Sequence, residues 1–203
     1  MNNLYFIDSK LNYKEPKDIL TPPLVVRTNK FDEESVQKFH DNMTNAMNTG
    51  QAVVPVIVDS YGGQVYALME MISIVQACPL PVATICLGKA MSCGSLLFCM
   101  GTKGMRYMGP HATLMFHDVS SGNHGKVEEI KTSAKQTEYL NNYIFKLAAK
   151  HLGKEEDFFL KKLHDMGHAE WYMPAVEAKE NNICNHIKIP QFTTKVELTQ
   201  TFE

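Results

Sequence analysis

The feature that most constrains the fold is an alternation of short apolar runs with segments of helical periodicity. Three apolar runs have the length of strands: residues 24–27, 53–58 and 82–87. Between them, apolar residues recur every three or four positions, as in Val36, Phe39 and Met43. Buried strands that alternate with helices are typical of βαβ crossovers, so we predict an α/β fold with a mostly parallel sheet.

The rest of the chain predicts further elements of a single domain. They are a short apolar helix over 92–100, short strands over 105–108 and 113–117, a long helix over about 126–150, a helix over 155–165, a short segment at 171–173 and a helix over 174–182. At ~1.5 Å per residue the helix over 126–150 would be about 37 Å long. A domain of this size does not need so long a helix, so we expect it to project and pack on a partner. Residues 1–23 form an irregular N-terminal segment and residues 188–203 a polar tail.

Composition excludes several functional classes. The 203 residues are 44% hydrophobic and 21% charged, which favours a packed core over disorder. A net charge of −2 gives no electrostatic reason to expect a nucleic-acid partner. The sequence has no apolar run of membrane-spanning length, and its start does not resemble a signal peptide, so we expect no membrane partner.

The metal-binding residue types do not form a recognisable site. The five cysteines include no CxxC pair, and the eight histidines include no HExxH motif. Four of the cysteines lie in apolar stretches, where a reduced thiol behaves as a small hydrophobic side chain. We therefore predict no metal and no disulfide framework, as is usual for a cytosolic protein.

A glycine pair follows the second strand. Gly62 and Gly63 lie between that strand and a helix, where they let the backbone approach a ligand and expose free N–H groups. A tight strand-to-helix turn without further function has the same pattern and is the commoner case.

Ser92 lies where the third strand turns into the short apolar helix. Its hydroxyl could be exposed there, with the N–H of Cys93 aimed at the position of an oxyanion. An N-cap serine is the structural alternative. Ser95 competes for the chemical role, but one turn into an apolar helix it is expected to be buried.

His117 closes an apolar strand just before a glycine-rich loop, so it is placed to enter a cleft. A serine nucleophile needs a base, and the base needs an acceptor on its other nitrogen. Glu170 and Asp165 are the candidate acceptors. Taken alone, a side chain such as that of His117, Glu170 or Asp165 is more often a solvated surface group.

Several motifs together are more specific than any one of them. They are the segments 60–63, 88–94, 101–106, 115–117, 122–125, 150–153 and 172–178. In order, spacing and context they resemble the ClpP family, the proteolytic subunits of Clp proteases, over residues 24–187. The resemblance implies a ClpP/crotonase-like fold, a repeated ββα superhelix with a protruding helical handle at about 126–150.

The resemblance also implies roles for individual residues. Ser92 falls on the nucleophile, His117 on the general base, and Gly63 and Cys93 on the two residues whose N–H groups form the oxyanion hole. Glu170 falls on the third triad position, where the family usually has aspartate. Extra residues around 164–169 leave Asp165 as the alternative acid.

Some positions depart from the family pattern. Tyr61 replaces the proline usual before the glycine pair, Asp118 and Val119 replace the Gln-Pro that follows the histidine, and Asn182 replaces a helix-capping glycine. The N-terminal segment, which builds axial pore loops in the family, shows no clear family pattern here.

The implied function is that of a serine endopeptidase without a cofactor. The family hydrolyses unfolded polypeptides inside a chamber of two stacked heptameric rings and receives its substrates from an AAA+ ATPase unfoldase. Such a homo-oligomer would work in the cytoplasm or in an organelle stroma or matrix.

Three other functions stay open. One is a catalytically weak, ClpP-like structural subunit, which the altered acid and the unusual Tyr61 and Asp118 suggest. Another is a signal-peptide or capsid-maturation protease of related fold. The third is a crotonase-type enzyme acting on acyl thioesters, against which the serine and histidine in register argue.

Overall fold

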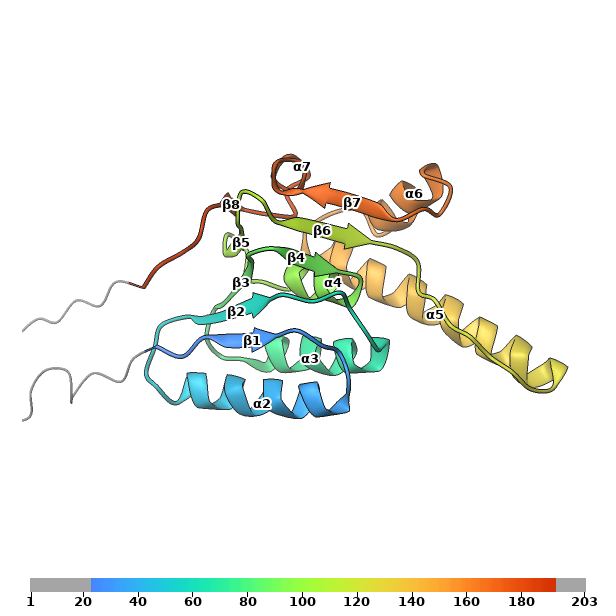
Figure 1. The fold of residues 1–203 in the computed structure, drawn as a ribbon, viewed down its shortest axis with the longest axis horizontal. Helices are drawn as coiled ribbons and strands as arrows, with labels where there is room; N and C mark the ends of the chain where they lie inside the picture. Colours follow the sequence, from blue (N-terminus) through green and yellow to red (C-terminus); the bar gives the residue numbers. More distant parts are fainter. Residues whose placement is uncertain (1–22, 193–203) are drawn as a thin grey trace, which may run out of the picture.

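A computed structural model of the protein describes residues 23–192. Most of the N-terminal segment and of the polar tail predicted from the sequence therefore lie outside the described residues. Strands and helices alternate along the chain (Figure 1). The elements are β1 (Val26–Thr28), α2 (Glu33–Met47), β2 (Val54–Val58), α3 (Val65–Ala77), β3 (Val82–Cys86), β4 (Lys89–Met91), α4 (Cys93–Cys99), β5 (Arg106–Met108), β6 (Thr113–Phe116), α5 (Val127–His151), α6 (Phe158–Asp165), β7 (Trp171–Pro174), α7 (Ala175–Glu180) and β8 (His186–Ile187).

The strands form two sheets. The larger one has the order β1-β2-β3-β5-β8, and all of its neighbouring pairs are parallel. The smaller one has the order β4-β6-β7, with β4 and β6 parallel and β6 and β7 antiparallel. The prediction of a mixed α/β fold with a mostly parallel sheet is confirmed.

Helices cover one face of the larger sheet. Asp32 caps the N-terminus of α2, because its carboxylate accepts a hydrogen bond from the Ser35 N–H at 2.8 Å. The apolar face of α2, with Val36, Phe39 and Met43, is buried, and α2 packs on α3 along the lower edge of Figure 1. An apolar hollow of about 300 Å³ is lined by strand residues that include Pro55, Ile57, Ile85 and Tyr107, and by residues 189–192 near the end of the described chain.

Arg106 joins the larger sheet to the segment that precedes β8. It is only 4% exposed, and its guanidinium donates hydrogen bonds to the carbonyls of Ile183, Gly101 and Asn182. Burial lowers the pKa of this guanidinium. The three carbonyls satisfy its donors, so a buried charge is tolerated here.

The long helix α5 has two different halves. Its C-terminal half is buried in the same chain through Leu140, Ile144 and Phe145. Its N-terminal half extends away from the body (Figure 1), and Val127 and Ile130 are 67% and 42% exposed. Leu140 and Ile144 are buried within the same chain, so only the N-terminal half of α5 leaves apolar residues exposed for the expected packing on a partner.

Two strands were absent from the sequence prediction. Residues 89–91 were expected to be a turn, but they form β4, which pairs with β6 and bridges to Ser60. The two-residue strand β8 pairs with β5. Both are too short for a periodic pattern, and tertiary pairing alone defines them.

Membrane-spanning helices are absent from the part of the chain that the structure describes. No helix among residues 23–192 is both long and apolar enough to cross a bilayer.

Candidate active site

Ser92 occupies a sharp turn between β4 and α4. Its φ of 55° is a left-handed value that non-glycine residues rarely adopt. Ser92 is the N-cap of α4, but its side chain makes no capping hydrogen bond. Capping of the helix therefore does not explain why a serine hydroxyl is present at this position. The backbone geometry matches the strained strand–turn–helix of a nucleophile elbow.

Backbone and side-chain bonds hold this turn on both sides. The Ser92 N–H donates to the Met115 carbonyl at 2.8 Å, which ties the turn to β6. The Ser95 hydroxyl donates to the Ser92 carbonyl at 2.7 Å. Ser95 itself is fully buried, as expected from the sequence, so of the two serines only Ser92 has an accessible hydroxyl.

The glycine pair is closely packed, Gly62 against Ser92 and Gly63 against Phe31. Gly62 and Gly63 have φ values of 109° and 154°, in the region that favours glycine. A Cβ on Gly62 would lie 2.7 Å from the Ser92 Cβ, and one on Gly63 would lie 2.5 Å from the Phe31 carbonyl oxygen. A side chain on Gly62 would therefore push the segment away from Ser92, and one on Gly63 would push it away from Phe31.

The N–H of Gly63 is available to a ligand. Within residues 23–192, the N–H groups of Gly62 and Gln64 bond to Ser60 Oγ and the Phe31 carbonyl, whereas that of Gly63 has no such acceptor. The Cys93 thiol donates to the Gly63 carbonyl at 3.3 Å, which links the two predicted oxyanion-hole residues.

His117 follows β6 directly and reaches the same pocket as Ser92. The pocket has a volume of about 40 Å³. Its lining consists of Ser92, His117, Gly63, Cys93, Val65, Leu96, Val119, Ser120 and Ile144. No hydrogen bond joins Ser92 to His117 in the described part of the chain.

The two candidate acids differ in their placement. The antiparallel pairing of β6 and β7 ends with the pair Phe116 and Trp171, so His117 and Glu170 are the residues that directly follow and precede the paired ones. The Glu170 carboxylate is exposed and accepts a 2.6 Å hydrogen bond from the Tyr172 hydroxyl, which raises the pKa of Tyr172. Asp165 ends α6, is 75% exposed and has His164 as its ion-pair neighbour at 4.0 Å. Neither acid bonds to His117 within residues 23–192.

Two side chains that the sequence did not single out hold the loop after His117. Asn141 of α5 donates to the Asp118 carboxylate at 2.8 Å and accepts from the Val119 N–H at 2.9 Å. His168 lies 2.6 Å from the same carboxylate. The only signal in the sequence was Asp118 itself, an unusual residue directly after the candidate base.

A comparison with protein-family models identifies the family to which the chain belongs. The family model described as Clp protease matches residues 12–190. The chain belongs to the Clp protease family. The resemblance predicted from the motifs is thereby confirmed, and at the family level this protein is a ClpP-like peptidase.

The four buried thiols of this Clp family member are poor nucleophiles. Burial raises the pKa of Cys86 and Cys99 to about 12 and also raises the pKa of Cys93 and Cys184. All five cysteines are free, and Cys78 alone is half-buried. Since the thiolate is the reactive form, Cys93 is not a competing nucleophile beside Ser92.

Metal ligands do not gather near the site. His164 and His168 are four residues apart, and their ring centroids lie 5.5 Å from one another. Even so, no group of three or more His, Cys, Asp or Glu side chains within residues 23–192 is arranged to hold a metal ion.

Proposed function

We propose that this protein is a serine endopeptidase that hydrolyses peptide bonds through an acyl-enzyme on Ser92. One observation carries the proposal. Ser92 has a strained backbone at the start of a helix, its side chain makes no capping hydrogen bond, and it lines the same pocket as His117. Gly62 packs against that serine, and the next residue, Gly63, has an N–H without an acceptor among residues 23–192 that could stabilise a tetrahedral oxyanion.

Each group then has a defined step. Ser92 Oγ attacks the peptide carbonyl carbon while His117 takes the hydroxyl proton. The N–H groups of Gly63 and Cys93 stabilise the oxyanion, and His117 gives the proton to the leaving amine as the C–N bond breaks. A water molecule, deprotonated by His117, then attacks the acyl-enzyme, and Ser92 regains its proton.

Glu170 is the proposed acid that orients His117 and stabilises its protonated form. The β6–β7 register supports Glu170 over Asp165, because Phe116 pairs with Trp171 and one further step along both chains leads to His117 and Glu170. Its carboxylate would turn from the Tyr172 hydroxyl toward the imidazole when substrate is bound. Glutamate is chemically competent for this task.

We predict that Glu170→Gln lowers kcat strongly, whereas Asp165→Asn leaves it near the wild-type value. Both changes keep the shape of the side chain and remove its charge. Loss of the acid in a triad costs on the order of 10⁴ in kcat. The measurement is kcat for a fluorogenic peptide. If only Asp165→Asn slows turnover, the assignment of the acid is reversed.

The proposed quaternary structure is that of the family. We infer a repeated ββα superhelix in which α5 is the handle, with two heptameric rings stacked through α5 around a chamber. The exposed apolar residues of its N-terminal half support this contact. Unfolded polypeptides would enter from an AAA+ ATPase unfoldase in the cytoplasm or in an organelle stroma or matrix.

A catalytically weak structural subunit is the second candidate. The observation in its favour is that, among the described residues, neither acid is hydrogen-bonded to His117. A maturation or signal-peptide-type protease would share the serine chemistry but act on a folded precursor.

A comparison of substrates tests the proposed function. Purified protein is incubated with a fluorogenic peptide, an unfolded protein, a folded protein and an acyl thioester. We expect cleavage of the peptide and, once an unfoldase or a denatured substrate is supplied, of the unfolded protein. Thioester turnover without peptide cleavage would indicate the crotonase-type alternative, and no turnover at all would indicate a structural subunit.

A further inference from the structure

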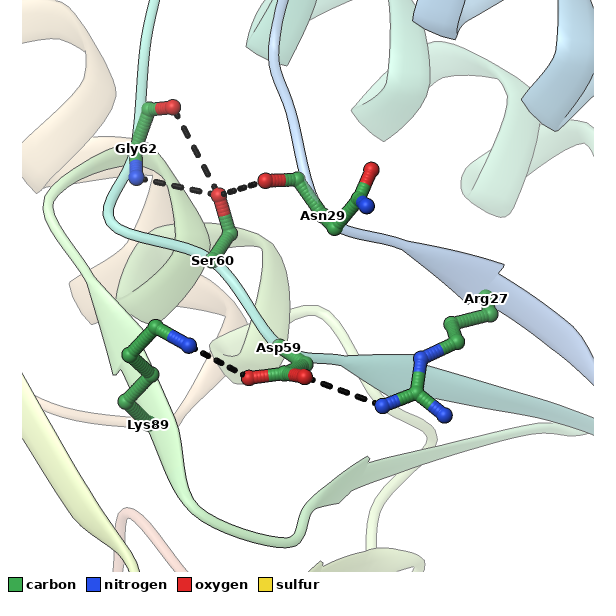
Figure 2. Close-up of polar contacts among 6 residues, drawn as sticks. All are labelled: Arg27, Asn29, Asp59, Ser60, Gly62 and Lys89. Atoms are coloured by element: carbon green, nitrogen blue, oxygen red, sulfur yellow. Dashed lines mark hydrogen bonds and ion pairs between the residues drawn. The ribbon is translucent and has the colours of Figure 1, made fainter.

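A group of three charged side chains lies beside the segment that carries the glycine pair. Asp59 follows β2 directly, and its carboxylate accepts hydrogen bonds from Lys89 Nζ at 2.8 Å and Arg27 Nη2 at 2.9 Å (Figure 2). Lys89 is the first residue of β4 and Arg27 lies within β1, so Asp59 connects two strands of the larger sheet to a strand of the smaller sheet. The Asp59 and Lys89 side chains are about 30% exposed and that of Arg27 is 57% exposed, so the Lys89 contact is the more sheltered one.

Lys89 holds the segment at two points. Besides the Asp59 carboxylate, its ammonium group lies 4.6 Å from the centroid of the Tyr61 ring, a cation–π distance. Lys89 therefore contacts the residues on both sides of Ser60. Its hydrogen bond with Asp59 raises the pKa of Lys89 and lowers that of Asp59, so both groups stay charged across the neutral range.

Ser60 continues this contact toward the active site. Its hydroxyl donates to the Asn29 carbonyl at 2.9 Å and accepts from the Gly62 N–H at 3.0 Å, as Figure 2 shows. Its backbone exchanges hydrogen bonds with β4, from the Ser60 N–H to the Lys89 carbonyl and from the Met91 N–H to the Ser60 carbonyl. The main chain and the hydrogen bonds of Ser60 thus connect Asp59 to Gly62, and Gly62 packs against Ser92.

The same lysine also begins the strand that delivers the nucleophile. Lys89 is the first residue of β4, and Ser92 follows the last residue of that strand. The Asp59–Lys89 pair therefore connects the start of the segment that carries the glycine pair to the start of β4, the strand that leads to Ser92. A shift between these two segments would change the distance from the Gly63 N–H to the oxygen that forms on a carbonyl attacked by Ser92.

We propose that Asp59 and Lys89 are positioning residues that fix the Gly63 N–H relative to Ser92. The inference rests on the proposed peptidase function and adds that its oxyanion hole depends on a charged pair outside the pocket. Partly exposed ion pairs contribute little to folding stability. An oxyanion donor, in contrast, must lie within a few tenths of an ångström of its working position.

The test uses the full-length protein and five variants. Lys89→Met and Asp59→Asn remove one charge each with little change of volume, and the double variant removes both. Lys89→Arg keeps the charge. Lys161→Met, in an exposed ion pair with Asp157 at 2.8 Å, is the matched control on α6. For each protein we measure kcat and KM for a fluorogenic peptide, the rate of labelling by a fluorophosphonate, and the melting temperature.

We expect Lys89→Met and Asp59→Asn to lower kcat roughly 10- to 100-fold with KM within about twofold of the wild type. The double variant should lose no more than the worse single variant, because the two residues act as one unit. Lys89→Arg should recover most of the rate, and Lys161→Met should match the wild type. Asp59→Asn serves as the test on its own if Lys89→Met does not fold.

The outcomes separate this inference from the proposed function. Three results would overturn the positioning role and leave the peptidase function intact. They are a wild-type kcat in Lys89→Met and Asp59→Asn, additive losses of kcat in the double variant, and losses of kcat that are explained by a lower melting temperature. Absence of Ser92-dependent hydrolysis in the wild-type protein would instead contradict the proposed function itself.

Discussion

Replacement of Ser92 by alanine is expected to abolish peptide hydrolysis while the protein keeps its fold. Loss of a triad serine lowers kcat by on the order of 10⁶. The folded state should be spared, because the Ser92 side chain makes no capping hydrogen bond that alanine would remove. The measurement pairs kcat for a fluorogenic peptide with the melting temperature of the variant.

A second serine variant controls for nonspecific damage. Ser73 lies on the exposed side of α3, and within residues 23–192 its hydroxyl bonds only to the Met69 carbonyl of its own helix. Ser73→Ala should keep the wild-type rate. Hydrolysis by purified Ser92→Ala at a rate near that of the wild type would show that Ser92 is not the nucleophile.

Carboxylates placed on the exposed N-terminal half of α5 are expected to dissociate the proposed assembly of two stacked rings. The double variant Val127→Asp with Ile130→Asp puts two charges into the proposed contact between rings, where an unpaired buried carboxylate costs several kcal/mol. The fold of the single chain should tolerate both changes. Val127 and Ile130 are exposed, and acidic residues are favourable in the first turn of a helix. Sedimentation velocity should show single rings or smaller species.

The same variant should lose activity together with assembly. The loop after His117 is fastened along α5, through Asn141 to Asp118 and Val119 and through a hydrogen bond shared by Ser121 and Thr137. A displaced helix would therefore move the loop that follows the base. Ser73→Asp, an exposed carboxylate on α3, is the control for added charge. A wild-type protein that sediments as a monomer at micromolar concentration with full activity would contradict both expectations.

Much of the fold follows from the sequence because its main elements carry their own periodic signals. The runs around Val56 and Ala83 and the helical spacing of Val36, Phe39 and Met43 predict strands and helices that the structure contains. The strands β4 and β8 have three and two residues, too few for a pattern. Their pairing comes from neighbours far away in the chain.

The candidate site was predictable only in part. A strand-to-helix turn locates Ser92, and the end of an apolar strand locates His117, so both could be proposed and both line one pocket. Local sequence could not decide between Glu170 and Asp165, since the choice depends on the β6–β7 register and on the rotamer of an exposed carboxylate. The roles of Asn141 and Lys89 come from contacts across strands and helices that no spacing in the sequence reveals.

Labelling with a serine-reactive fluorophosphonate, followed by peptide mapping, tests the central claim most directly. The probe forms a covalent bond only with an activated serine, so it reports the nucleophile without knowledge of the natural substrate. We predict a single adduct on Ser92, absent from Ser92→Ala and formed more slowly in a His117→Ala variant. An adduct on another serine, or no adduct on protein that cleaves peptides, would contradict the assignment of Ser92 as the nucleophile.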